Sequence, residues 1–255
     1  MFLSLVSGSS GNCSLISDGK THLLADCGLS CKNLETALAK VDLKPSDLNG
    51  ILITHEHTDH IRGVGAVSRK YGTPVYATLK THTAMNIGTV TDIRYLNPDI
   101  DFEIGTIGIN PFSIPHDAAA PVGYNFFFGT KKLSLATDIG RMNDYIMQHL
   151  SGSIAVLLES NHDSRMLMAG RYPAALKRRI SGELGHLSNS EAAQTALELI
   201  KSGTCHIMLG HLSNENNTPN TAYLETANLL ENNGLKLGKD VGLSVAARYE
   251  VSCFR

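Results

Sequence analysis

The chain has 255 residues, of which 42% are hydrophobic and 18% are charged. This composition supplies a sizeable core and excludes intrinsic disorder of the whole chain. The length suits one large domain, residues 1–255. The net charge of −2 argues against a protein that coats nucleic acid or binds membranes through a polybasic surface. The 11 histidines stand out, because several of them are close together in the sequence.

The cysteines and the first residues indicate the cellular compartment. The five cysteines are odd in number and none forms a CxxC pair, which argues against a disulfide framework. No stretch approaches the ~18 consecutive apolar residues of a membrane-spanning helix, and the first residues lack the charged region of a secretory signal. We therefore expect a cytoplasmic protein without a membrane partner.

Short strands and helices alternate along the chain. The first third predicts strands at 2–6, 14–17, 22–25, 50–54 and 75–77, and helices at 31–41 and 63–71. The middle third predicts strands at 102–104, 106–109, 112–114, 124–128, 132–136 and 154–158. The last third predicts helices at 173–180, 191–200 and 221–232 and a strand at 206–209, with a capping box from Ser188 to Glu191. This alternation is typical of the α/β class.

The most informative motif directly follows the apolar strand 50–54. It contains three histidines and an aspartate within six residues: His55, His57, Asp59 and His60. Burying so many polar groups without partners would cost several kcal/mol, so they are not core residues. Imidazole nitrogens and carboxylate oxygens are ligands of divalent metals. Because His55 and His57 alternate while Asp59 and His60 turn toward a second point, the motif predicts a site for two metal ions.

This motif resembles the HxHxDH signature of the metallo-β-lactamase superfamily, and the resemblance extends along most of the chain. It implies a four-layer αβ/βα sandwich. Compared with the superfamily's nucleases that carry an inserted cap domain, the 73 residues from Asp138 to His211 are too few, so we expect no cap domain. It also implies further site residues near later strand ends: His116, Asp138 and His211 as metal ligands, and Asp26 as the residue that orients the metal-binding loop. By this resemblance, one metal takes His55, His57 and His116, the other takes Asp59, His60 and His211, and Asp138 bridges them.

The donor types permit Zn²⁺, Mn²⁺ or Fe²⁺. Two such ions lower the pKa of a water between them toward neutrality, so that a bridging hydroxide is the expected nucleophile, held by Asp59 and Asp138. This chemistry serves phosphodiesters, thioesters and lactams alike. The metal motif alone therefore leaves the substrate open.

Three features favour the nucleic-acid branch of the superfamily. Ser213 follows His211 by two residues, as in its nucleases. Glu159, at a strand end, precedes Gly185-His186, which resembles the acid-then-Gly-His series of that branch. With the Gly-rich opening 7–12, the repeated GHLSN at 185–189 and 210–214 matches the YycJ/WalJ/VicX group, regarded as 5′→3′ exonucleases acting on DNA. The alternative is a small-molecule hydrolase of the same fold, acting on a cyclic phosphodiester or a thioester.

Other candidate residues have competing explanations. His186, oriented by Glu159, is the candidate general acid, although a helix-capping role near Ser188 is the alternative. Ser213, Asn214 and His162 are candidate substrate contacts, and for His162 a structural role is an equal alternative. The backbone amides of residues 9–11 suit a phosphate, or form a plain turn. The basic cluster of residues 171–179 suits phosphate contact, or is a solvated helix face.

Overall fold

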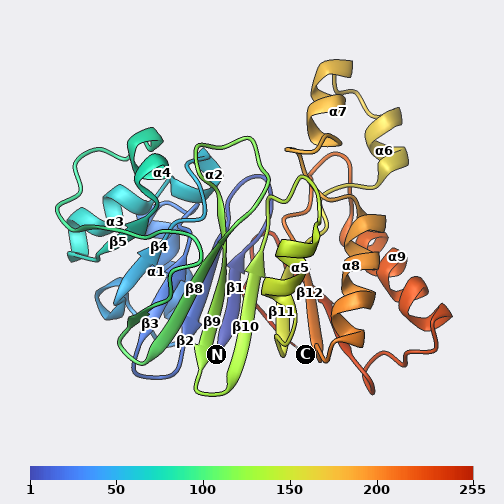
Figure 1. Ribbon diagram of the computed structural model, residues 1–255. Helices are drawn as coiled ribbons and strands as arrows, with labels where there is room; N and C mark the ends of the chain where they lie inside the picture. Colours follow the sequence, from blue (N-terminus) through green and yellow to red (C-terminus); the bar gives the residue numbers. More distant parts are fainter. Residues whose placement is uncertain (255) are drawn as a thin grey trace. The chain divides into compact units, whose positions relative to one another are not determined.

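The computed structural model describes residues 1–254 (Figure 1), and the chain divides into two compact units. The amino-terminal unit comprises Met1–Ser113, Ala118–Gly129 and Ala247–Cys253. The carboxy-terminal unit comprises Ile114–Asp117 and Thr130–Ala246, together with Phe254. That the whole chain forms a single domain without an inserted cap domain stays a prediction.

The amino-terminal unit is built on a seven-stranded sheet with the order β14-β1-β2-β3-β4-β5-β6. Its strands are β1 (Phe2–Val6), β2 (Cys13–Ser17), β3 (His22–Ala25), β4 (Gly50–Leu52), β5 (Val75–Ala77), β6 (Ile93–Tyr95) and β14 (Ser252–Cys253). The pairs from β3 to β6 are parallel, and the others are antiparallel. The carboxyl ends of β3 and β4 therefore meet at one edge, where Asp26 and the histidine motif follow them.

Four helices belong to this unit: α1 (Cys31–Ala39), α2 (Thr58–Ile61), α3 (Val64–Tyr71) and α4 (Leu79–Ala84), with a 3₁₀ turn at Pro45–Asp47. Apolar residues at helical spacing on α1 and α3 pack with strand residues such as Leu24 and Ile51 in one core. The metal-binding loop that was expected after strand 50–54 contains a single helical turn. This turn is α2, which begins at Thr58.

A three-stranded antiparallel arrangement of β7 (Phe102–Ile104), β8 (Ile107–Ser113) and β9 (Val122–Phe128) completes the unit. The prediction of two strands at 106–109 and 112–114 is wrong, because β8 runs continuously through Pro111. Proline has no N–H to give to a ladder. The register explains why it is tolerated: β7 pairs only with β8 residues up to Ile109, so Pro111 lies beyond the end of β7.

The carboxy-terminal unit contains four parallel strands in the order β10-β11-β12-β13. They are β10 (Lys131–Ala136), β11 (Ala155–Glu159), β12 (His206–Gly210) and β13 (Gly242–Val245), and β11 is buried along its whole length. Continuous apolar runs such as β11 are typical of parallel strands covered on both faces. Parallel pairing brings the ends of β10, β11 and β12 to one edge, where Asp138, Glu159 and His211 lie.

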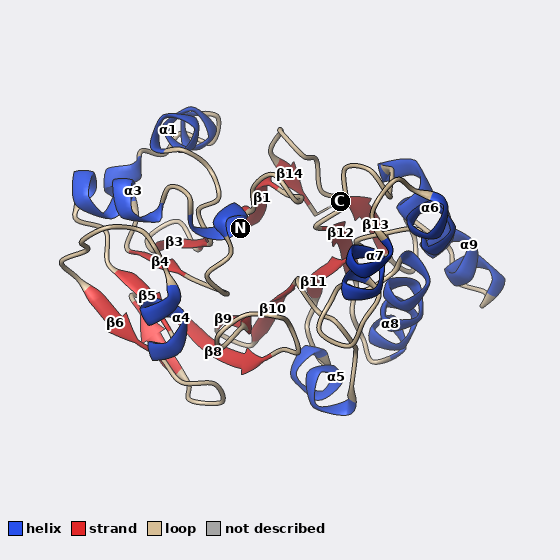
Figure 2. Cartoon of the chain, turned by 90° about the horizontal axis from the view of Figure 1, so that it is seen from above, coloured by secondary structure: helices blue, strands red, loops and turns tan. Residues whose placement is uncertain are grey.

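Five helices connect these strands: α5 (Asp144–Leu150), α6 (Ser164–Ala169), α7 (Ala174–Ile180), α8 (Asn189–Lys201) and α9 (Pro219–Asn232). The predicted capping box of α8 is confirmed, because the Ser188 hydroxyl accepts from the Glu191 N–H while the Glu191 carboxylate accepts from the Ser188 N–H. α8 and α9 lie side by side (Figure 2). Within residues 1–254, no helix combines the length and the apolar character needed to span a membrane.

Tyr124 fixes the strand that leads into the histidine motif. It is fully buried, and its hydroxyl donates a 2.6 Å hydrogen bond to the carbonyl of Ile53. We expect Tyr124→Phe to lower the free energy of unfolding by about 1–3 kcal/mol, because the substitution removes a buried donor. Urea unfolding followed by circular dichroism measures the change. Tyr249→Phe, at a side chain that is 72% exposed, is the matched control, and an equal loss in both variants would contradict the explanation.

Candidate metal centre

The buried carboxylate of Asp26 organises the histidine motif in the amino-terminal unit. Its Oδ1 accepts the Thr54 N–H at 2.8 Å, and its Oδ2 accepts the Thr54 hydroxyl at 2.8 Å. The same Oδ2 lies 2.7 Å from Nδ1 of His60. Because an ionised carboxylate only accepts, the His60 proton belongs on Nδ1 and its ring lone pair on Nε2. Carboxylates orient metal-ligating histidines in this way.

The other members of the motif lie beside His60. The Nδ1 of His55 is 3.0 Å from the Thr54 hydroxyl, and the His55 ring centroid is 4.1 Å from that of His60. The His57 ring is 4.5 Å from the His55 ring. Asp59, in the first turn of α2, places a carboxylate oxygen 3.4 Å from Nε2 of His60. The structure thus brings together the four predicted residues of this motif.

Asn12 is a site residue that the sequence analysis did not single out. Its side-chain amide lies 3.2 Å from a carboxylate oxygen of Asp59 and 3.1 Å from Nε2 of His60. A turn in the Gly-rich opening positions it, with the Gly8 N–H donating to its side-chain oxygen and the Gly11 N–H donating to the Gly8 carbonyl. The Gly11 amide therefore serves the turn, as the plain-turn interpretation expected.

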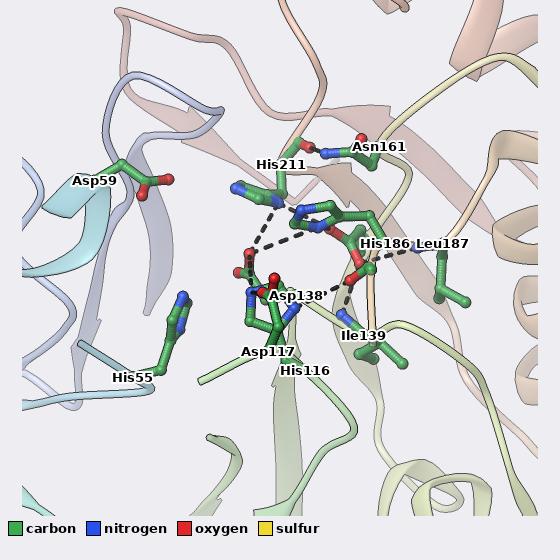
Figure 3. A network of polar contacts seen from close by, with 12 residues as sticks. His55, Asp59, His116, Asp117, Asp138, Ile139, Asn161, His186, Leu187 and His211 are labelled. Atoms are coloured by element: carbon green, nitrogen blue, oxygen red, sulfur yellow. Dashed lines mark hydrogen bonds and ion pairs between the residues drawn. The ribbon is translucent and has the colours of Figure 1, made fainter. Parts of the chain in front are cut away.

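The fully buried carboxylate of Glu159 organises the carboxy-terminal unit. Figure 3 shows the side chains of His186, His211 and Asp138 gathered in this unit. Its Oε1 lies 2.8 Å from Nδ1 of His186 and 2.8 Å from Nδ1 of His211. Its Oε2 accepts the N–H of Ile139 at 2.7 Å and that of Leu187 at 3.2 Å. The expected partnership of Glu159 with His186 is present, and the same oxygen also holds His211, which the sequence analysis did not foresee.

The repeated GHLSN segments have a common structural role. Residues 160–162 lie between them, because the Asn161 N–H donates to the Leu187 carbonyl and the Asn161 side-chain amide donates to the His211 carbonyl. The Ser213 N–H donates in turn to the Asn161 carbonyl. Each segment thereby presents its histidine to the same oxygen of Glu159. The alternative that His186 caps α8 is wrong, since the capping residue is Ser188.

Asp138 and His116 complete this cluster. The Asp138 Oδ1 is 3.4 Å from Nδ1 of His211, 3.7 Å from Nδ1 of His186 and 3.8 Å from Nε2 of His116. The Nδ1 of His116 bonds the Gly185 carbonyl at 3.0 Å. Burial is the main influence on His116 and lowers the pKa of its imidazole, which favours the neutral form that binds metals.

The two neighbouring histidines offset the effect of burial on the pKa of Glu159. Desolvation by itself raises the pKa of this carboxyl. The charges and hydrogen bonds of His186 and His211 lower it by more, so the pKa of Glu159 lies well below its ordinary value. Glu159 is therefore an anion that fixes the orientation of both rings.

Three site residues have left-handed backbone conformations that side chains other than glycine rarely adopt. The φ angles are 61° at Asp26, 61° at Asp138 and 55° at His211, and each residue directly or closely follows a strand. Such strain persists where the surrounding structure enforces it, and it concentrates at functional sites.

The three candidate substrate contacts differ in their exposure to solvent. Ser213 is buried, and its hydroxyl accepts the N–H of Asn216, while Asn214 is exposed. His162 is 2% exposed, and burial lowers the pKa of its imidazole.

Comparisons with known proteins identify the family. Residues 21–207 match the family model described as the beta-lactamase superfamily domain. Exodeoxyribonuclease YycJ of Bacillus anthracis is 41% identical over 242 residues, which cover 93% of this chain and 92% of the relative. Exodeoxyribonuclease WalJ of Streptococcus pneumoniae D39 is 41% identical over 248 residues, covering 92% and 90%. The chain belongs to the metallo-β-lactamase superfamily.

Solved structures of other proteins show the same fold. The metallo-beta-lactamase fold protein YhfI from Bacillus subtilis aligns with a TM-score of 0.70 at 16% identity over 98% of both chains. Zn²⁺-bound PqqB from Methylobacterium extorquens aligns with a TM-score of 0.71 at 15% identity over 99% of this chain and all of PqqB. The predicted superfamily, its αβ/βα sandwich and the resemblance to the YycJ/WalJ group are confirmed.

The donor chemistry of this superfamily member fits divalent metals. In five histidines, His55, His60, His116, His186 and His211, Nδ1 lies within hydrogen-bond distance of a protein oxygen. In the four of these that are candidate ligands, His55, His60, His116 and His211, this leaves Nε2 as the ring atom that offers a lone pair to a metal. The chain therefore supplies imidazole and carboxylate groups of the kind that hold divalent metals.

The role of Asp26 in orienting His60 is testable through metal affinity. We expect Asp26→Asn to weaken metal binding by about 10- to 100-fold, because the amide does not reproduce the charged acceptor at His60 Nδ1. Competition with a chromophoric chelator measures Zn²⁺ affinity. Asp42→Asn makes the same substitution at an exposed residue with a φ angle of 58° and is the matched control. Unchanged affinity in Asp26→Asn would contradict the orienting role.

Proposed function

We propose that this protein is a metal-dependent exodeoxyribonuclease that hydrolyses the phosphodiester bonds of DNA in the 5′→3′ direction. The observation that carries the proposal is the 41% identity, over nine-tenths of the chain, to relatives named exodeoxyribonucleases. The arrangement of His186 on Glu159 beside the candidate ligand His211 supports it, because it places a proton-donating group next to a metal ligand.

We propose that two divalent metals are the cofactors. The first has the ligands His55, His57 and His116, the second has Asp59, His60 and His211, and Asp138 bridges them. The clusters within each unit support this assignment. When bound, two such ions supply a nucleophilic hydroxide near neutral pH and stabilise charge on the phosphate oxygens. Zn²⁺ and Mn²⁺ are the first choices, with Fe²⁺ as a third.

The carboxylates and His186 have separate roles in hydrolysis. Asp59 and Asp138 orient the attacking water through their oxygens. His186 is the general acid for the leaving oxygen, since its side chain is 21% exposed whereas those of His211 and Glu159 are 3% and 0% exposed. Glu159 accepts from Nδ1 of His186 and so directs Nε2 toward the substrate, and the proton carried on Nε2 is the one donated to the leaving oxygen.

We assign Ser213, Asn214 and His162 to substrate binding, and the three differ in how exposed they are to a substrate. Asn214 is exposed, directly follows Ser213 and lies three residues after His211, and it suits a hydrogen bond to a phosphate. The burial of His162 favours an indirect contribution through neighbouring groups. A cytoplasmic location agrees with the five cysteines, all of which are free thiols.

Duplex and single-stranded DNA with a label at either end tests the activity. With Mn²⁺ or Zn²⁺ added, we expect mononucleotides to be released progressively from the 5′ end, and chelation to abolish the release. Thioesters and cyclic nucleotides are assayed in parallel. Hydrolysis of these small molecules without cleavage of DNA would contradict the proposed function.

His186→Ala tests the general acid. We expect kcat on DNA to fall by about 10²- to 10⁴-fold, the usual contribution of a positioned acid. Metal content, measured by elemental analysis, stays at the wild-type value because His186 is not among the proposed ligands. His82→Ala, on α4 of the amino-terminal unit, is the control and retains full activity. Loss of a metal equivalent in His186→Ala would instead make His186 a ligand.

A further inference from the structure

Positive charge is concentrated in residues 164–183, here called the basic arm. The basic arm contains α6, α7 and their connections, and it links the end of β11 to the segment of His186. Its twenty residues carry five basic side chains and one acidic side chain, in a chain whose net charge is −2. The basic residues are Arg165, Arg171, Lys177, Arg178 and Arg179. A segment of net charge +4 therefore belongs to a protein that is otherwise acidic.

The basic arm is exposed (Figure 1). α7 buries none of its residues, and α6 buries only Leu167. The Arg165 side chain is 93% exposed, although its guanidinium lies 3.7 Å from the Asp163 carboxylate. Arg171 and Arg178 are exposed as well. Lys177 and Arg179 have structural contacts, because Lys177 donates to the Met168 carbonyl and Arg179 pairs with Asp117. Arg165, Arg171 and Arg178 are thus the charges best placed to meet a partner.

Helix electrostatics explains only part of this charge. Lys177, Arg178 and Arg179 lie in the last turn of α7, where cations are favoured by the helix dipole. Arg165 lies in the first turn of α6, where a cation is disfavoured, and Arg171 lies between the helices. A solvated helix face usually also intersperses acids among its bases. The additional cations point to a polyanionic ligand.

The end of the basic arm is fixed to the site residues of its own unit. The Ile180 carbonyl accepts the His186 N–H at 2.8 Å, and the Leu184 carbonyl accepts the Asp117 N–H at 3.1 Å. The approach is so close that a Cβ on Gly185 would lie 2.1 Å from the Ile180 carbonyl oxygen. The position of a ligand bound by the basic arm is therefore fixed relative to His186 and His116.

We propose that the basic arm binds the phosphate backbone of the DNA strand whose end is hydrolysed at His186. The proposal rests on the proposed function and adds a binding surface to it. Arg165, Arg171 and Arg178 contact phosphates rather than bases, so the arm holds the strand without selecting its sequence. Binding through phosphates releases counterions, and the affinity accordingly falls as salt rises.

The test is the triple variant Arg165→Glu, Arg171→Glu, Arg178→Glu. Fluorescence anisotropy with a labelled 30-nucleotide DNA in Ca²⁺ measures Kd between 50 and 300 mM KCl. We expect Kd at about 100 mM KCl to rise at least tenfold. The slope of log Kd against log salt falls by about 2, because each lost phosphate contact contributes ~0.7 on single strands. The ratio of kcat/KM on this DNA to kcat/KM on bis(p-nitrophenyl) phosphate falls by a similar factor.

The control variant carries the same charge change elsewhere in the unit. Lys201→Glu, Lys236→Glu, Lys239→Glu alters exposed residues outside the basic arm, at the end of α8 and before β13. We expect its Kd to change less than threefold. Thermal unfolding and metal content verify that both variants are folded. An unchanged salt slope in the arm variant, or an equal loss in the control, would overturn the proposal.

The two proposals fail in different ways. If wild-type protein releases no nucleotide from DNA with any metal, the proposed function fails, while the anisotropy still reports whether the basic arm binds DNA. If wild-type protein cleaves DNA and the arm variant binds and cleaves it equally well, the assignment of the basic arm fails alone.

Discussion

The site residues of the carboxy-terminal unit depend on one buried anion, the carboxylate of Glu159. Such a group is costly away from water unless all of its acceptor positions are used. Two backbone N–H groups and two imidazoles use them here. Glu159 ends β11, and its donors come from the segments after β10 and β12 and from the segment before α8, so one carboxylate fixes the relative positions of Asp138, His186 and His211.

Asp26 does the equivalent work in the amino-terminal unit. It too follows a buried strand, and it holds one backbone N–H, one hydroxyl and one imidazole. In both units the carboxylate contacts Nδ1 of a histidine, which assigns the tautomer and directs Nε2 outward. The two units use the same arrangement although their segments are unrelated. In each, a strand positions a carboxylate at or just after its end, and that carboxylate orients a histidine ring.

The sequence predicted features that are local in the chain. The motif from His55 to His60, the strand ends and the capping box of α8 could be recognised because neighbouring residues carry the signal. Non-local pairing was inaccessible, and so neither Asn12 beside His60 nor the second histidine on Glu159 was foreseen. α4, α5 and α6 have six or seven residues, make fewer than two turns and show little periodicity, and they were missed, although α7 of seven residues was predicted. Pro111 misled the strand prediction, since only the register shows where β7 ends.

The left-handed conformations of Asp26, Asp138 and His211 have a consequence for evolution and engineering. Each costs the folded chain roughly 1–3 kcal/mol that a glycine would not cost. Screens that select only for heat resistance would therefore favour replacements at these positions that relieve the backbone while removing the chemistry. At these three residues, a gain in thermal stability would therefore come with a loss of catalytic turnover.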